Sequence, residues 1–202
     1  MKGLIKDFYT LAKQMKFFMV FIVIFALLPG FSFMTFAIVY ATMLPMTAIA
    51  YDERSKWDKL AAMMPYSAMD IVLSKYILGL LMVLATAVFS CFAQEIIGIF
   101  KHSSITVVFL TQLSLVVCFA LIIEAIELPV LIKFGTEKGR MLMIIFMVVA
   151  AVGGAALVEN TVEFAFGNLN LAIILPLAVL AAVVVNVLSV LISQALYKSK
   201  ME

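Results

Sequence analysis

The side chains best suited to chemistry in this 202-residue chain are polar groups that interrupt long apolar runs. Glu124 and Glu127 lie three residues apart in IIEAIELPV, a spacing that puts both on one face of a helix. Gln112 precedes them in the same run, and Glu95 falls in the run before it. Because an ionised carboxylate in hydrocarbon is costly, all four side chains should face protein, a cavity or one another.

Two interpretations of these polar residues remain open. In the first, they hydrogen-bond to neighbouring helices or approach the membrane interface near Lys133. In the second, they form a polar lining that meets a cationic or amphipathic substrate, or they carry protons. Pro129 follows closely, and a proline inside a helix leaves the carbonyl four residues earlier, at Ala125, without its backbone donor.

The motifs of soluble catalysts and nucleotide-binding proteins are absent from the sequence. It contains no GxxxxGK[ST] phosphate loop, no HExxH and no GxSxG. Cys91 and Cys118 lie within apolar runs as small hydrophobic residues, and the single His102 has no partner ligands. No basic stripe interleaved with aromatic residues indicates nucleic-acid binding. We therefore expect no catalytic residue, no metal or cofactor bound by this chain, and no nucleic-acid partner.

The composition indicates that lipid is the solvent for most of the chain. Hydrophobic residues make up 66% and charged residues 13%, against about 25% charged in a typical soluble domain. Six apolar segments occur, at residues 17–28, 31–50, 71–100, 105–132, 141–158 and 171–196. We therefore predict an all-α integral membrane protein with six transmembrane helices. The first two segments could instead form one helix broken at Pro29, although Pro29-Gly30 is typical of a tight turn.

The basic residues predict the orientation in the membrane. With a cytoplasmic N-terminus, thirteen of the fourteen Lys and Arg residues fall on the inner side, and only Lys101 falls outside. We therefore place both termini in the cytoplasm. The single domain, residues 1–202, then comprises an amphipathic interfacial helix (1–16), spans one and two (17–50), a cytoplasmic loop (51–69), spans three and four (70–132), a second cytoplasmic loop (133–140), spans five and six (141–196) and a cytoplasmic tail (197–202).

The first cytoplasmic loop is unusual for so apolar a chain. Residues 51–75, YDERSKWDKLAAMMPYSAMDIVLSK, hold eight charged residues and the only tryptophan, Trp57. Ser67 and Asp70 have the spacing of a capping box for the next helix. A solvated hairpin loop would explain the charges, but it would not need the tryptophan or the apolar residues that follow it, Leu60, Met63 and Met64. Exposed aromatic and apolar side chains among charges favour a docking surface.

The same loop resembles the ABC type-2 permeases of the small six-span kind, which are similar to the permease subunits of phenol-soluble modulin exporters. Members of that family read Y-(D/E)-E-x-x-x-W-(D/E) and continue with a Pro-x-Ser and a Ser-Lys-Tyr. The matching residues here are Tyr51, Asp52, Glu53, Trp57, Asp58, Pro65, Ser67, Ile71, Val72, Ser74, Lys75 and Tyr76. Ala68 stands where many members carry a basic residue.

The resemblance implies the transmembrane subunit of an exporter in the bacterial cytoplasmic membrane. Such permeases pair with a second copy or a homologous permease and bind two ABC ATPase subunits, which hold the ATP and Mg²⁺. The cargo would be an amphipathic or hydrophobic substrate, such as cytolytic or antimicrobial peptides. The loop would contain the coupling helix that contacts the ATPase, with the contact residues Asp52, Glu53, Arg54, Lys56, Trp57, Asp58, Lys59, Leu60 and Met63.

Two other functions remain open on the sequence. An ion-coupled secondary transporter would use Glu124 and Glu127 as proton sites. A membrane scaffold or immunity protein would move no substrate. Because the chain lacks a phosphate loop, ATP-driven transport would need energy from a separate ATPase chain.

Overall fold

The computed structural model describes residues 31–57, 67–101, 107–139 and 171–201, together with positions 20, 24, 60, 63, 141 and 144. Every regular element within those residues is a helix, which confirms the predicted all-α class for this part of the chain. The helices are α3 (Phe31–Ala41), α4 (Met43–Arg54), α6 (Ala68–Lys101), α7 (Val107–Phe134) and α9 (Leu171–Met201).

Three helices are long and apolar enough to cross a membrane. The candidate spans are Met69–Ile96 in α6, Phe109–Phe134 in α7 and Leu175–Ser199 in α9, and they coincide with the third, fourth and sixth predicted segments. The first and fifth predicted segments lie outside the described residues, apart from single positions, as does the interfacial helix predicted at residues 1–16. The count of six spans therefore stays a prediction.

The second predicted segment, residues 31–50, consists of two helices that meet at Thr42. Helices α3 and α4 have 11 and 12 residues, and a span takes about 20. The backbone amide and hydroxyl of Thr42 both donate to the carbonyl of Val39, at 3.1 and 2.7 Å. Pro45 explains the break, because it has no N–H to donate to the carbonyl of Ala41. Helix α4 then continues through Arg54, past the predicted end of the segment.

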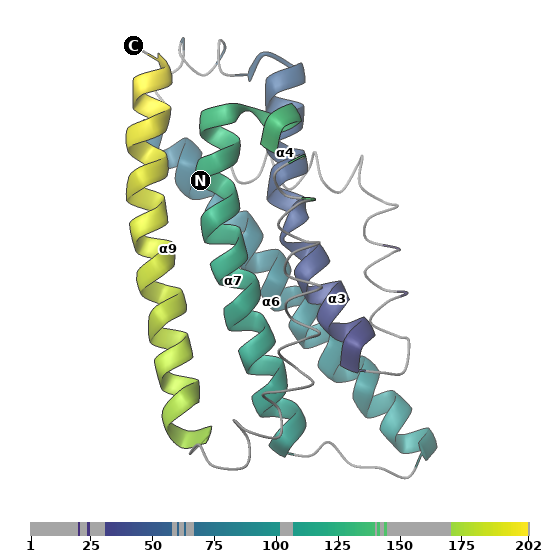
Figure 1. Ribbon diagram of the computed structural model, residues 1–202. Coiled ribbons are helices and arrows are strands. Elements are labelled where there is room, and N and C mark those ends of the chain that lie inside the picture. Colours follow the sequence, from purple (N-terminus) through teal and green to yellow (C-terminus); the bar gives the residue numbers. More distant parts are fainter. Residues whose placement is uncertain are drawn as a thin grey trace.

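The described helices form a bundle in which α7 and α9 run side by side, while α6 crosses behind α7 (Figure 1). Helices α3 and α4 pack against α6. The end of α4, the start of α6 and the ends of α7 and α9 meet around one small cavity. We call this region the junction end, and it positions most of the loop residues that the sequence singled out.

The interior of the bundle is apolar and joins four helices. One cluster of buried residues combines Ile38 of α3, Leu44 of α4, Val83 of α6 and Ala120 of α7. In contrast, most of the apolar side chains of α9 are exposed, among them Leu177, Leu180, Val183, Val187 and Leu191. Burial thus follows inter-helix contact, and the exposed apolar face is the surface that a helix presents to lipid.

Candidate functional site

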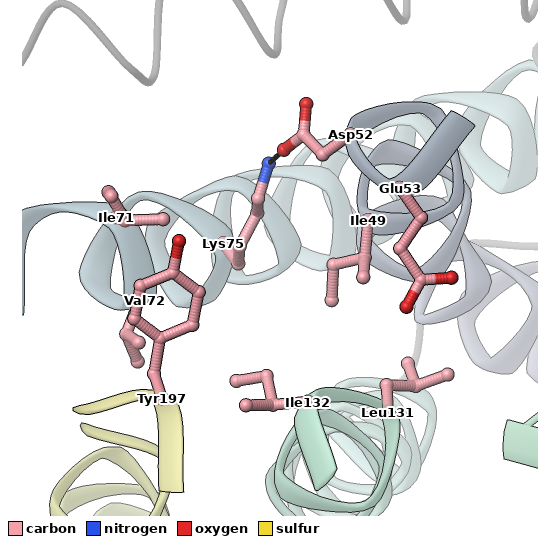
Figure 2. A pocket seen from close by; sticks show the side chains of 9 residues that line it. All are labelled: Ile49, Asp52, Glu53, Ile71, Val72, Lys75, Leu131, Ile132 and Tyr197. Atoms are coloured by element: carbon pink, nitrogen blue, oxygen red, sulfur yellow. Dashed lines mark hydrogen bonds and ion pairs between the residues drawn. The ribbon is translucent and has the colours of Figure 1, made fainter. Parts of the chain in front are cut away.

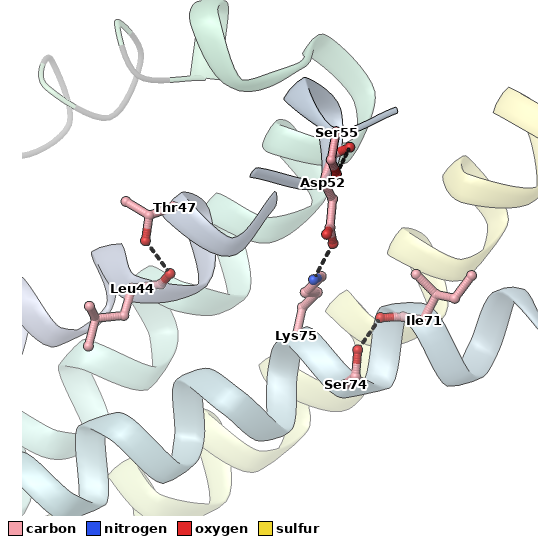
Figure 3. A network of polar contacts seen from close by, with 7 residues as sticks. All are labelled: Leu44, Thr47, Asp52, Ser55, Ile71, Ser74 and Lys75. Carbon is pink, nitrogen blue, oxygen red and sulfur yellow. Dashed lines mark hydrogen bonds and ion pairs between the residues drawn. The ribbon is translucent and has the colours of Figure 1, made fainter. Parts of the chain in front are cut away.

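A buried ion pair ties the end of α4 to the start of α6. The ammonium group of Lys75 lies 2.5 Å from a carboxylate oxygen of Asp52 (Figure 3). The two residues are only 5% and 8% exposed. Charges are rarely buried to this degree unless they are paired. Asp52 therefore acts within the chain, as a contact between two helices.

The next residue in the sequence binds a different element. Oε2 of Glu53 accepts hydrogen bonds from the backbone amide and the hydroxyl of Thr136, at 3.1 and 2.5 Å. Thr136 opens the helical turn after Gly135, whose φ of 79° lies in the left-handed region that favours glycine. The amide of Gly135 donates to the carbonyl of Leu131 at 2.9 Å and so closes the last turn of α7. Glu53 thus holds the segment that leaves α7.

The two contacts border a cavity of about 40 Å³ at the junction end (Figure 2). Its lining comes from four helices and comprises Ile49, Asp52, Glu53, Ile71, Val72, Lys75, Leu131, Ile132 and Tyr197. A space of about 10–15 Å³ on this measure holds one water molecule. The cavity is therefore suited to a few waters beside the ion pair, and it is far too small for an amphipathic cargo.

The chain turns sharply after α4 and leads into the exposed part of the loop. The amide of Lys56 donates to the carbonyl of Glu53 at 3.2 Å, and Lys56 adopts a left-handed φ of 53°. Arg54 and Lys56 are exposed. Beyond the turn, Trp57 is half-buried, Leu60 is exposed and Met63 is 84% exposed. An apolar side chain exposed to this degree beside basic residues is a surface suited to a partner protein.

The start of α6 shows the predicted cap. The amide of Asp70 donates to the hydroxyl oxygen of Ser67 at 3.1 Å, and that hydroxyl lies 2.9 Å from the carboxylate of Asp70. Ser67 therefore satisfies one of the free amides at the helix N-terminus. Lys75 follows less than two turns later, so this cap helps to fix the depth at which its side chain enters the bundle.

Glu124 and Glu127 are buried in the described bundle without hydrogen-bond partners. They are 1% and 9% exposed, and none of their four carboxylate oxygens has a partner in the part of the chain that the structure describes. Glu124 packs against α6 at Gly79, where a side chain would collide with its carboxylate and would lie 2.8 Å from Pro45 of α4. The absence of a side chain at Gly79 therefore makes room for the acid.

A polar seam joins α7, α9 and α6 next to these acids. The hydroxyl of Ser189 donates to the carbonyl of Ala125, which is the carbonyl predicted to be released by Pro129. The hydroxyl of Tyr76 bonds to those of Ser189 and Ser193, at 2.5 and 2.8 Å. The prediction of a free carbonyl is confirmed, and a side chain of α9 supplies the missing donor.

A second bridge lies one turn further along the same two helices. The side-chain amide of Asn186 donates to the carbonyl of Leu121 on α7 at 3.1 Å and to that of Ala182 on its own helix at 2.9 Å. Small and polar residues face α7 at near-heptad intervals along α9, at Ala182, Asn186, Ser189 and Ser193. Small and hydrogen-bonding residues favour close packing of membrane helices. Helices α7 and α9 are thus held together by side-chain bonds to backbone carbonyls.

The sequence profile of a family described as "ABC-2 family transporter protein" matches residues 4–198. The chain belongs to the ABC-2 transporter family. Comparison with curated proteins and with solved structures gave no match. Members of the ABC-2 family are membrane subunits that work with ABC ATPase subunits and are not themselves catalytic. This chain is therefore a multi-pass membrane protein of an ABC transporter.

The predicted coupling residues of this ABC-2 protein fall into two groups. Asp52 and Glu53 point into the bundle and make contacts within the chain. The outward group comprises Arg54, Lys56, Leu60 and Met63. Asp58 and Lys59 lie outside the described residues. The ATPase contact assigned to each of these positions stays a prediction.

The four intramembrane polar residues do not form one lining in this ABC-2 protein. Glu95 is exposed and lies sixteen residues from Gly79 on α6, or about 24 Å along the helix. Gln112 is half-buried and lies twelve residues before Glu124 on α7, or about 18 Å. Only Glu124 and Glu127 are buried together. No group of three His, Cys, Asp or Glu residues suited to a metal ion occurs among the described residues.

Sequence reasoning missed Lys75 and Thr136 as functional partners. Lys75 counted only as a basic residue near a membrane interface, yet it lies seven residues inside α6 among apolar neighbours. A lysine at that depth needs an acid, and this signal was present in the sequence. Thr136 carried no comparable signal, because its role depends on where the end of α7 meets α4.

Proposed function

We propose that this chain is the permease subunit of an ATP-driven exporter in the bacterial cytoplasmic membrane. It would pair with a second copy or a homologous permease and bind two ABC ATPase subunits, which hold the ATP and Mg²⁺. The cargo would be an amphipathic or hydrophobic molecule, such as a cytolytic or antimicrobial peptide. The distribution of basic residues supports cytoplasmic termini, and it puts the junction end in the cytoplasm.

The observation that carries this proposal is the pair of contacts made by consecutive residues at the end of α4. Asp52 binds Lys75 near the start of α6, and Glu53 binds Thr136 just after α7. A force applied to the loop after α4 would therefore reach two membrane-spanning helices at once. Energy from an ATPase docked on the loop could enter the bundle by this route.

The outward face of the loop supports docking of a partner protein. It combines the basic side chains of Arg54 and Lys56 with the apolar side chains of Leu60 and Met63. Apolar anchors surrounded by charges are typical of binding hot spots. We therefore assign the contact with the ATPase to this outward group and to Trp57, and we assign transmission into the bundle to Asp52 and Glu53.

Affinity purification of the full-length chain from its native membranes tests the proposal. We expect an ATPase with a GxxxxGK[ST] motif to co-purify, and ATP hydrolysis by the complex to exceed that of the free ATPase. Met63→Asp should reduce recovery of the ATPase at least tenfold. Met141→Asp is the matched control, because Met141 is also strongly exposed, at 71% against 84% for Met63. Failure of any such ATPase to co-purify with the wild-type chain would overturn the proposal.

A second variant separates transmission from docking. Thr136→Val removes the hydroxyl that binds Glu53 but keeps the size of the side chain. We expect the ATPase to co-purify normally with this variant, while stimulation of its activity falls. Normal stimulation by Thr136→Val would show that this contact does not carry the signal.

The unpartnered acids favour an ion-coupled secondary transporter as the alternative function. Two buried carboxyl groups without partners among the described residues are suited to carrying protons. Export by this mechanism would survive depletion of ATP and collapse on addition of a protonophore. The ATP-driven proposal predicts the opposite result in the same cells.

A further inference from the structure

An apolar groove lies between α6, α7 and α9, on the side of the buried acids away from the junction end. Its volume is about 310 Å³. The lining comprises Ala87, Leu110, Leu113, Ser114, Val117, Cys118, Leu121, Val179, Ala182 and Val183. Pockets for small ligands in proteins begin at about 300 Å³. The groove is therefore large enough for a hydrocarbon chain, unlike the small cavity at the junction end.

One face of α7 connects this groove to the buried acids. Leu113, Val117 and Leu121 line the groove at intervals of four residues, and Glu124 follows three residues later. That spacing keeps Glu124 on the same face, about 4.5 Å further along the helix. Asn186 crosses from α9 to the carbonyl of Leu121 at the same level. The apolar stripe of α7 thus ends in a polar region.

The charge of the acids defines what they lack. The carboxylate oxygens of Glu124 and Glu127 have no hydrogen-bond partners among the described residues. The nearest basic residue along α6, Lys75, lies one turn from Gly79 and is paired with Asp52. A carboxylate at this depth is stabilised by a positive charge that accompanies it. A cationic group is therefore the complement to these acids.

We propose that the groove and the two acids form one binding site for an amphipath with a cationic head group, an ammonium or a guanidinium. The hydrocarbon part of the ligand occupies the groove, and the head group reaches Glu124 and Glu127. The inference rests on the proposed function, since it assigns the cargo class of that exporter. It commits to a monocationic amphipath, as opposed to an anionic or uncharged one.

The helices that must move to admit the head group follow from the contacts. Gly79 of α6 and Pro45 of α4 close over Glu124. On the other side, α9 is bonded to α7 through Asn186 and Ser189. Val83 lies buried on α6 between Gly79 and the groove residue Ala87. A shift of α6 away from α7 would therefore open the path, while α7 and α9 stay together.

Binding to the full-length chain in phosphatidylcholine nanodiscs tests the site. The probe is tritiated dodecylammonium, measured by scintillation proximity, with empty nanodiscs to subtract partitioning into lipid. We expect saturable binding that unlabelled dodecylammonium displaces at a concentration at least tenfold lower than dodecanol, which has the same chain without the charge. Equal competition by the two compounds would overturn the proposal.

Two pairs of variants separate the acids from the groove. Glu124→Gln combined with Glu127→Gln should weaken binding at least tenfold, whereas Glu95→Gln, at an exposed acid, should leave it within twofold. Val183→Trp should obstruct the groove, whereas Val184→Trp changes the neighbouring exposed residue, which does not line it. Wild-type affinity in the double glutamine variant would overturn the role of the acids, and the same result for Val183→Trp would overturn that of the groove.

Two features keep this test decisive. If the double glutamine variant does not fold, Glu124→Asp retains the charge but withdraws it by one methylene, and at least threefold weaker binding is then expected. Unchanged affinity in this variant would count against the site. The assay contains neither ATP nor an ATPase. A negative result alongside normal co-purification of the ATPase would therefore reject the site and leave the proposed function standing.

Discussion

Replacement of Asp52 with Asn should destabilise the protein, because it removes the charge that balances the ammonium group of Lys75. The two groups are 2.5 Å apart and both residues are buried. Asparagine has nearly the same shape as aspartate, so the change leaves the packing of α4 intact and affects mainly the charge. Lys75 then remains in the bundle without its counter-charge, and it must be neutralised or hydrated there.

The structure sets the expected size of the effect. Removal of one partner from a buried ion pair costs about 3–5 kcal/mol. The cavity of about 40 Å³ beside Asp52 and Lys75 lets water approach both groups, which favours the lower end of that range. For a chain of this size 1 kcal/mol corresponds to about 2–4 °C in Tm. A loss of about 3 kcal/mol therefore predicts a decrease in Tm of about 6–12 °C.

Thermal unfolding followed with a thiol-reactive fluorescent dye measures this effect. The chain has two cysteines, Cys91 and Cys118, and both are free, one half-buried and one buried. They react with the dye as the bundle opens. Arg54→Gln is the control, since it removes an exposed charge from the same turn of α4.

A double-mutant cycle tests whether the two residues act as a unit. Asp52→Leu combined with Lys75→Met replaces the pair with apolar residues, which is often neutral or stabilising for buried pairs. We expect the double variant to melt well above Asp52→Leu alone. A Tm for Asp52→Asn within 1 °C of wild type, or strictly additive effects in the cycle, would refute the reasoning.

Three further variants test other parts of the structure. Ser189→Ala should cost about 1–2 kcal/mol by thermal unfolding, since it leaves the carbonyl released by Pro129 without a donor, and the cost should fall in a Pro129→Ala background, where a backbone amide is restored. Gly79→Ala should lower stability by about 1–3 kcal/mol through its collision with the carboxylate of Glu124, and Glu124→Asp should recover part of the loss. Lys56→Gly should leave Tm unchanged or raise it slightly, because a left-handed φ costs a non-glycine residue about 1–2 kcal/mol; a clear decrease would show that the lysine side chain itself matters.

The course of the long helices could be predicted from the sequence. The apolar run at residues 71–100 corresponds to α6 (Ala68–Lys101), and the run at 171–196 begins at the same residue as α9. Long uninterrupted apolar runs bounded by charges specify a helix and its depth together. The cap of Ser67 on Asp70 and the carbonyl released by Pro129 were also predictable, since both depend on neighbours within four residues.

The partners across helices could not be predicted in the same way. Glu124 meets Gly79, and Ser189 meets Ala125, only because of how the helices cross and where each is rotated about its axis. Periodicity places a residue on a face of its helix, but it does not say which helix that face meets. The break at Thr42 is different, because Pro45 stood inside the predicted segment and its effect on the helix could have been anticipated.

The geometry at the end of α4 explains how one short stretch can serve both docking and transmission. Consecutive residues on a helix point about 100° apart, so neighbouring side chains reach different elements. Asp52 and Glu53 accordingly bind α6 and the segment after α7, while Arg54 faces outward. Neither acid can move without displacing the other. A rotation of α4 imposed from the loop would therefore pull on the two helices that flank Glu124, where α6 and α7 are held together only by packing against Gly79 among the described residues.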